Sequence, residues 1–198
     1  MVVDVLMEQD YFQPSFYRFN QDSLHLVKFI QQRKLGTSLN FLDVGSGCGV
    51  IGIELAVAFP KWQGSLLEAQ GEFISFLEVN RKLFKVDHLT IIHSPVEAYR
   101  NQTFFDLIVF NPPYFFEGMG RPTADLARRR CRHIEELAFH KWLEICALKL
   151  KPGGSLCFCF RKDSLQHIDF SSFGLSLALK EVQGSVAFFH LLKKREST

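Results

Sequence analysis

The sequence predicts an α/β fold: a mostly parallel β-sheet with helices on both faces and an antiparallel hairpin near its C-terminal end. Short apolar runs alternate with stretches whose apolar residues recur at helical spacing, and the connections between them are short. This order of strand and helix is typical of parallel sheets buried on both faces. Near the end, two strand-like runs are joined at Gln183-Gly184, which indicates a hairpin.

Five buried strands are expected before the hairpin, because five apolar runs are bounded by turn residues. These runs are 38–44, 64–69, 89–93, 105–110 and 155–160. The hairpin strands, 174–182 and 185–193, complete an expected sheet of seven strands.

Three helices are expected between these strands, at 50–59, 71–84 and 134–150, and a further helix follows the N-terminal segment. The amphipathic stretch 134–150 is expected to end at Pro152-Gly153-Gly154, since proline and glycine commonly follow a helix C-terminus.

The length of 198 residues favours one domain, 1–198, with an N-terminal segment and helix (1–37) before the core (38–198). The chain is 47% hydrophobic and 22% charged, and its net charge of +2 is too small to indicate a nucleic-acid binder. No apolar run approaches the ~18 residues that a membrane span needs. The N-terminus lacks the basic region of a secretory signal.

Five cysteines, an odd number, favour reduced thiols and a cytoplasmic protein. Cys157 and Cys159 alternate on one side of a strand, but no second pair with ligand spacing accompanies them. No metal is therefore expected.

A glycine-rich loop, DVGSGCG (43–49), follows the first strand and leads into a helix, which indicates a nucleoside cofactor. Two cofactors compete for it. Residues 47–52 match the dinucleotide pattern G-x-G-x-x-G, but they begin two residues late relative to the strand. Glu68, at the end of the second strand, suits the ribose hydroxyls of either cofactor.

The alternative is that the loop, an acidic residue followed by G-x-G-x-G, resembles the S-adenosylmethionine loop of class I methyltransferases. That resemblance implies that Asp43 lies near the cofactor ammonium, directly or through water. It implies that the loop backbone packs against the cofactor at Gly45, Ser46, Gly47 and Gly49. A third acidic residue of these enzymes meets the adenine, and Glu97 is the nearest candidate for it.

The fourth strand ends at Asn111-Pro112-Pro113-Tyr114, where two prolines stop the strand and stiffen the backbone beyond it. The side-chain oxygen of Asn111 and the carbonyl of Pro112 can accept both N–H groups of a planar amine and so aim its lone pair at a methyl donor. Tyr114 offers a face for stacking a base. Phe115 either extends that platform or packs beneath it.

The loop and the NPPY motif together resemble the class I methyltransferases that modify planar amino nitrogens, with their Rossmann-like fold of seven strands. These families act on DNA adenine N6, RNA adenine N6, RNA guanine N2 or protein glutamine N5. The N-terminal segment, with Gln13, Phe19, Asp22 and Ser23, resembles that of the bacterial valine-tRNA adenine-N6 methyltransferases. This resemblance implies that Gln13 and Asp22 border S-adenosylmethionine and that the substrate is an adenosine beside the tRNA anticodon.

Five arginines come after the NPPY motif and suit RNA phosphates. They are Arg121, Arg128, Arg129, Arg130 and Arg132. A protein glutamine-N5 enzyme, an RNA guanine-N2 enzyme and an inactive cofactor-binding scaffold remain open alternatives.

Overall fold

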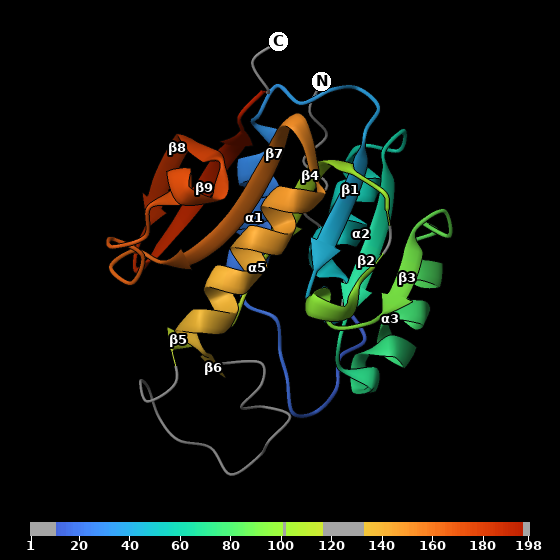
Figure 1. The fold of residues 1–198 in the computed structure, drawn as a ribbon. Helices are drawn as coiled ribbons and strands as arrows, with labels where there is room; N and C mark the ends of the chain where they lie inside the picture. The colour runs from blue at the N-terminus through green and yellow to red at the C-terminus, as the bar shows by residue number, and fades with distance from the viewer. Residues whose placement is uncertain (1–10, 101, 117–132, 196–198) are drawn as a thin grey trace.

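The computed structural model describes residues 11–100, 102–116 and 133–195, and its centre is one seven-stranded sheet (Figure 1). Its strands are β1 (Asn40–Val44), β2 (Gln63–Glu68), β3 (Thr90–His93), β4 (Phe105–Phe110), β7 (Leu150–Arg161), β8 (Leu175–Gln183) and β9 (Val186–Lys193). Their order across the sheet is β3-β2-β1-β4-β7-β9-β8. The first five strands are parallel, and β9 runs antiparallel to both β7 and β8. The predicted fold class, including the hairpin, is confirmed.

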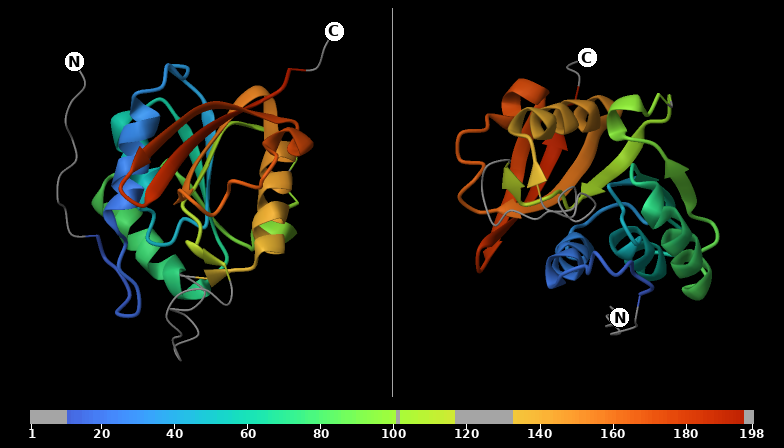
Figure 2. Two further views of the ribbon diagram at one scale, coloured as in Figure 1. Left: turned by 90° about the vertical axis from the view of Figure 1, so that its left-hand side faces the viewer. Right: turned by 90° about the horizontal axis from the view of Figure 1, so that it is seen from below.

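Helices cover both faces of the sheet (Figure 2). The α-helices are α1 (Gln21–Gln31), α2 (Val50–Ala58), α3 (Gly71–Leu83) and α5 (Glu136–Lys149). The 3-10 helices are η1 (Val96–Ala98) and η2 (Phe170–Phe173). α1, α2 and α3 enclose one apolar core, and α5 encloses the second on the opposite face. A separate parallel pair, β5 (Phe115–Phe116) and β6 (His133–Ile134), lies beside the start of α5 (Figure 1).

Alternation along the strands divides their side chains between these two cores. In β4, Leu107 and Val109 face one core, while Ile108 and Phe110 face the other. On this second face the Phe110 ring stacks on Phe158 of β7, and Phe158 stacks on Phe189 of β9, each with ring centroids 4.8 Å apart. This ladder of three rings fixes the register of three neighbouring strands.

The sequence prediction is wrong at the junction between α5 and β7. The helix ends at Lys149, and β7 begins at Leu150 rather than at residue 155. Leu150 already pairs with Phe105, and the register shifts before Leu107 pairs with Ser155. Pro152-Gly153-Gly154 therefore forms an irregularity inside the strand instead of ending the helix. Gly153 adopts φ +78° there, a conformation that suits a bulge.

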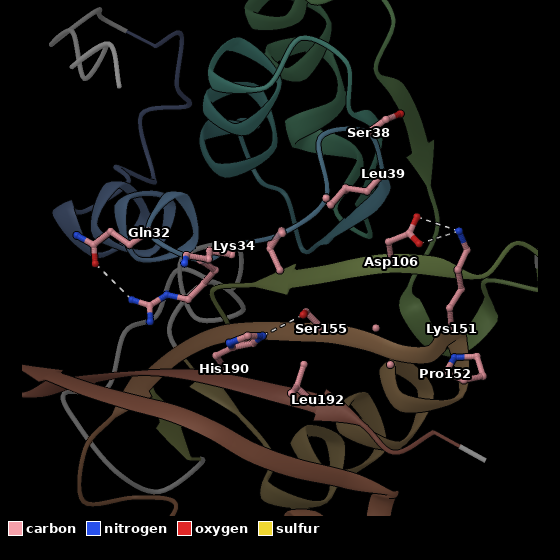
Figure 3. A pocket seen from close by; sticks show the side chains of 15 residues that line it. Gln32, Lys34, Ser38, Leu39, Asp106, Lys151, Pro152, Ser155, His190 and Leu192 are labelled. Carbon is pink, nitrogen blue, oxygen red and sulfur yellow. Dashed lines mark hydrogen bonds and ion pairs between the residues drawn. The ribbon is translucent and has the colours of Figure 1, made fainter. Parts of the chain in front are cut away.

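The amino ends of the strands border a cavity of about 540 Å³ (Figure 3). On its wall the Lys151 Nζ lies 2.8 Å from Asp106 Oδ1, and His190 Nε2 lies 2.9 Å from Ser155 Oγ. Parallel α/β sheets bind ligands at the opposite edge, beyond the carboxyl ends of the strands. A catalytic site is therefore expected at that opposite edge. Among the helices of the described ranges, none has both the length and the apolar composition that crossing a bilayer requires.

Candidate active site

The glycine loop and the NPPY motif follow neighbouring strands of the sheet at the same edge. β1 and β4 pair in parallel, and Val44 at the end of β1 lies opposite Phe110 at the end of β4. Gly45 and Asn111 are the next residues of the two strands. The register of the sheet therefore brings the two motifs side by side, at the edge where the parallel strands have their carboxyl ends.

All three glycines of the loop need the left-handed region of backbone space. Gly45, Gly47 and Gly49 have φ of +68°, +54° and +87°. A Cβ at Gly49 would lie 2.8 Å from the Leu77 side chain of α3, so this glycine also permits close helix packing. A Cβ at Gly45 or Gly47 would meet no described atom closer than 3.7 Å. At the first two glycines a Cβ would therefore make only ordinary van der Waals contacts, with Trp142 and Phe73, and it is the positive φ that favours glycine there.

Asp43 lies at the end of β1 beneath this loop and is 1% exposed. Its Oδ2 accepts a hydrogen bond from the Gly52 N–H at 2.9 Å, whereas its Oδ1 is buried with no hydrogen-bond partner in the described part of the chain. Burial raises the pKa of the Asp43 carboxyl to about 7, opposed by the Gly52 bond and assisted by the charge of Glu68. A cationic ligand or a bound water would satisfy the free oxygen.

Glu68 ends β2 and is 4% exposed. Its two oxygens accept hydrogen bonds from the backbone N–H groups of Gly47 and Gln70, each at 2.7 Å. Burial raises the pKa of Glu68, and these backbone bonds oppose the shift. The carboxylate therefore joins the glycine loop to the start of α3, at the position where the sequence predicts contact with ribose hydroxyls.

Asn111 is held at both ends of its amide. Its Nδ2 donates to the Ser23 Oγ of α1 at 3.0 Å, and its Oδ1 accepts from the Cys159 Sγ of β7 at 3.2 Å. An amide oxygen has two lone pairs, so one acceptor position of Oδ1 is left for a substrate N–H. The bonds to Ser23 and Cys159 set which way that oxygen points.

Tyr114 also contacts Cys159, the residue that donates to Asn111. Its hydroxyl lies 3.3 Å from the Cys159 Sγ, and the Asp22 carboxylate also faces it. Burial raises the pKa of the Tyr114 phenol and, separately, of the Cys159 thiol. Both groups are therefore neutral at physiological pH. They act as hydrogen-bonding groups, and neither is a base or a nucleophile.

The two prolines of the NPPY motif follow Asn111. Pro112 is buried, and Pro113 is partly exposed. Phe115 begins β5, which pairs with β6 just before α5. The five arginines predicted to bind RNA (Arg121, Arg128, Arg129, Arg130 and Arg132) lie outside the described residues.

The N-terminal segment predicted to border the cofactor is closed by Gln13. The Gln13 Oε1 accepts from the Phe19 N–H at 2.8 Å, so this amide holds residues 13–19 in a loop before α1. Asp22, in the first turn of α1, accepts from Asn20 Nδ2 at 2.7 Å. Since Ser23 is the next residue, α1 carries Asp22 and the Asn111 anchor on the same turn.

Glu97 occupies η1, and its Oε1 accepts a hydrogen bond from the Trp142 Nε1 at 2.8 Å. Trp142 is in turn the side chain nearest to a Cβ built at Gly45, at 3.7 Å. Glu97 therefore reaches the glycine loop through this tryptophan of α5. The sequence does not indicate this linking role of Trp142, because a tryptophan in an amphipathic helix has the pattern of an ordinary core residue.

Cys159 is a second member of the site that sequence reasoning missed, since in the sequence it stands out only as half of a cysteine pair in a strand. Cys157 and Cys159 are both buried, and they face the core that α1 helps to enclose. The four cysteines in the described ranges, Cys48, Cys146, Cys157 and Cys159, form no disulfide.

Comparisons with known proteins identify relatives of the chain. The sequence profile of the family described as GidB, rRNA small subunit methyltransferase G, matches residues 11–111, about half of the chain. The ribosomal RNA small subunit methyltransferase G of Pseudomonas aeruginosa is 33% identical over 127 residues, which are 64% of this chain and 57% of that protein. A tRNA1(Val) (adenine(37)-N6)-methyltransferase of Pedobacter heparinus is 31% identical over 145 residues, 71% of this chain and 60% of that protein.

The chain therefore spans about three-fifths of the length of these curated relatives. Among solved structures, the ribosomal protein L11 methylase of Lactobacillus delbrueckii subsp. bulgaricus superposes with a TM-score of 0.70 at 17% identity, covering 90% of this chain and 81% of that one. At this identity the superposition establishes a common fold.

Proposed function

Since the chain belongs to the GidB family of methyltransferases, we propose that it transfers a methyl group from S-adenosylmethionine to an exocyclic amino nitrogen of RNA, specifically adenine N6 in tRNA. The observation that carries the proposal is the Asn111 amide, held by Ser23 and Cys159 beside the glycine loop. The tRNA assignment is supported by the Pedobacter relative and by the N-terminal segment with Gln13 and Asp22.

The residues around the glycine loop suit S-adenosylmethionine. The unpartnered Asp43 Oδ1 would accept from the ammonium group or from a water bound to it, and Glu68 would accept from the ribose hydroxyls. Glycine at positions 45 and 47 leaves the loop backbone without side chains, which would let a nucleoside approach it closely. When bound, the cofactor supplies an electrophilic methyl sulfonium.

The chain's own contribution to the reaction is the positioning of the amine. An aromatic amino nitrogen is a poor nucleophile because its lone pair is delocalised into the ring. Acceptance of one N–H by Asn111 Oδ1 and the other by the Pro112 carbonyl would turn that lone pair out of the ring plane and toward the methyl group. No strong base is needed in this arrangement, in agreement with the neutral Tyr114 and Cys159 beside it.

The RNA part of the proposal depends on other residues. The five arginines after the NPPY motif would neutralise phosphates, and Tyr114 would stack on a base. A single-stranded loop, whose bases can turn outward, suits such a pocket without the melting of a duplex. The same two acceptors, Asn111 Oδ1 and the Pro112 carbonyl, would also bind the N–H groups of a glutamine carboxamide. A protein substrate is therefore the second candidate.

A transfer assay tests the substrate. The protein is incubated with S-adenosylmethionine carrying a labelled methyl group and, separately, with unmodified tRNA, ribosomal RNA or release factor. We expect label in N6-methyladenosine of tRNA. Label in ribosomal RNA alone or in protein alone would refute the tRNA assignment. Cofactor binding with no transfer to any substrate would favour an inactive scaffold.

A substitution tests whether Asn111 positions the substrate amine. Asn111→Ala removes the acceptor and is expected to lower the transfer rate by about 10²–10³-fold, the usual effect of losing one preorganised hydrogen-bonding group. Cofactor affinity should stay within about twofold, because Asn111 belongs to the amine side of the site. Asn40→Ala, an exposed asparagine at the opposite end of the neighbouring strand, is the matched control. Equal loss of transfer and cofactor affinity in Asn111→Ala would contradict the assigned role.

A further inference from the structure

Three side chains from two separate segments meet at the first turns of α5, and none of them is among the residues assigned to methyl transfer. Glu136 and His140 lie four residues apart on α5 and so share one face of the helix. His167 comes from the segment between β7 and η2. One donor atom from each of the three lies within 4.8 Å of the others.

The spacing of these donor atoms is close to that of a metal site. Zinc binds nitrogen and oxygen at about 2.0–2.2 Å, so two ligands at tetrahedral angles are about 3.4 Å apart. The Nε2 of His167 and the Oε1 of Glu136 are now 2.6 Å apart, and no pair in the trio exceeds 4.8 Å. Shifts of about 1 Å, within the reach of side-chain rotation, would bring all three to ligand distance.

His140 has an unpaired nitrogen in a ring that is held by packing. Its Nε2 is buried and has no hydrogen-bond partner among the described residues. Buried polar nitrogens are nearly always paired, so an unpaired one needs an explanation. The ring is held edge-on against Phe173 of η2, with centroids 6.0 Å apart at 81°. His140 thus has an imidazole held by packing and an unpaired ring nitrogen, and one of its two ring nitrogens lies within 4.8 Å of the His167–Glu136 pair. Such a side chain is suited to coordinate a metal.

We propose that Glu136, His140 and His167 form a binding site for one divalent transition-metal ion, with zinc the ion that fits best. Two histidines and one carboxylate are a known zinc ligand set that leaves a fourth position open to water. Imidazole nitrogens favour zinc and its neighbours in the first transition row over magnesium or calcium. Side-chain exposures of 51% for Glu136 and 56% for His167 give the ion a route in from solvent.

The ion would cross-link two elements near the carboxyl edge of the sheet. Glu136 lies in the first turn of α5, and His167 follows β7, whose end is at that edge. The link would join α5, which carries Trp142, to the segment that leads into the C-terminal hairpin. The sequence predicts no metal because its cysteine pair has no partner ligands at suitable spacing. His167 is 31 residues from Glu136 in the chain, too far for any local ligand spacing.

Metal titration tests the site directly. The full chain is treated with a chelator, which is then removed, and the protein is titrated with Zn²⁺ by calorimetry. We expect one high-affinity Zn²⁺ site that depends on this trio. At a hundredfold excess of Zn²⁺ over its Kd, the Tm should rise by roughly 5–10 °C. Co²⁺ in place of Zn²⁺ should give the visible absorption of a tetrahedral nitrogen and oxygen site, without the intense sulfur charge-transfer band of a thiolate site.

Substitutions assign the ligands. His167→Ala and Glu136→Gln should each weaken Zn²⁺ binding at least tenfold while leaving the Tm of the metal-free protein within a few degrees, because both side chains are half exposed. His88→Ala, at an exposed histidine beyond the end of α3, is the matched control and should bind as the unsubstituted chain does. Undetectable Zn²⁺ binding, or binding unchanged in both ligand variants, would overturn the proposal and leave an ordinary surface pair of His167 and Glu136.

Discussion

Replacement of Ser23 by alanine tests whether the orientation of the Asn111 amide matters for methyl transfer. The Ser23 Oγ is the acceptor for Asn111 Nδ2 at 3.0 Å, and Ser23 is only 5% exposed. The substitution removes one hydroxyl from α1 and leaves the Cys159 bond to the other end of the amide intact. The amide then has one anchor instead of two, and it can rotate.

The expected magnitude is set by that one bond. A neutral hydrogen bond contributes about 0.5–1.5 kcal/mol, and 1.4 kcal/mol corresponds to a factor of ten in rate. We therefore expect Ser23→Ala to lower kcat/KM by about three- to tenfold, far less than the loss expected for Asn111→Ala. Asn111 is partly exposed, so water can reach its freed N–H, and the stability loss should be about 1 kcal/mol.

The assay compares methyl transfer at saturating cofactor with cofactor affinity measured by calorimetry. Ser38→Ala, at an exposed serine beyond the opposite end of the sheet, is the matched control and should leave both quantities unchanged. Transfer by Ser23→Ala at the rate of the unsubstituted chain would show that the Ser23 anchor is irrelevant. A parallel fall in cofactor affinity would place Ser23 in the cofactor site instead.

Three other features of the structure can be tested by pH or by substitution. Because burial holds the pKa of Asp43 at about 7 and an ammonium ligand favours its ionised form, affinity for S-adenosylmethionine should fall as pH drops below 7, by up to about tenfold per unit. Calorimetry from pH 5 to 8 checks this, and Asp43→Asn should flatten the profile; a flat profile in the unsubstituted chain contradicts it. Gly49→Ala adds a clash with α3 to a positive φ and should lower the free energy of unfolding by about 2–4 kcal/mol. At Gly174, φ is +70° and no atom of the described residues lies within 4 Å of an added Cβ, so Gly174→Ala should cost about 1–2 kcal/mol. Equal losses in urea denaturation would refute the packing argument. Lys151→Met should change that free energy by less than about 1 kcal/mol because its ion pair is partly exposed to solvent. Asp106→Ala also loses a bond from a backbone N–H of β1 and should cost about 1–2 kcal/mol. A larger loss in Lys151→Met than in Asp106→Ala would contradict this.

The fold could be predicted because its signals are local. Strand and helix periodicities are visible in short windows, and the alternation of the two determines the sheet class. The start of β7 could not be predicted in the same way. Pro152-Gly153-Gly154 has the composition of a helix end and equally that of a strand irregularity. Only the pairing of Leu150 with Phe105 across the sheet distinguishes the two.

The candidate site likewise has residues that the sequence predicts and contacts that it does not. Asp43, the loop glycines and Asn111 stand out in the sequence because glycine and proline impose backbone geometry by themselves. The contacts that orient Asn111 come from residues 88 and 48 positions away, Ser23 and Cys159. A single sequence carries no signal for such pairs. Their proximity results from the strand order, which places β7 beside β4 and α1 against the same face.

The position of β9 has a consequence for how the chain reaches its native state. β9 is synthesised after β8 yet lies between β7 and β8, and it pairs with both. On the ribosome, a nascent chain that has emerged only as far as β8 leaves the edge of β7 without its neighbour and β8 without any strand to join. Such edges invite association with other chains. Completion of the sheet must therefore await residues 186–193, and a polypeptide cut short before them would be prone to aggregation rather than merely smaller.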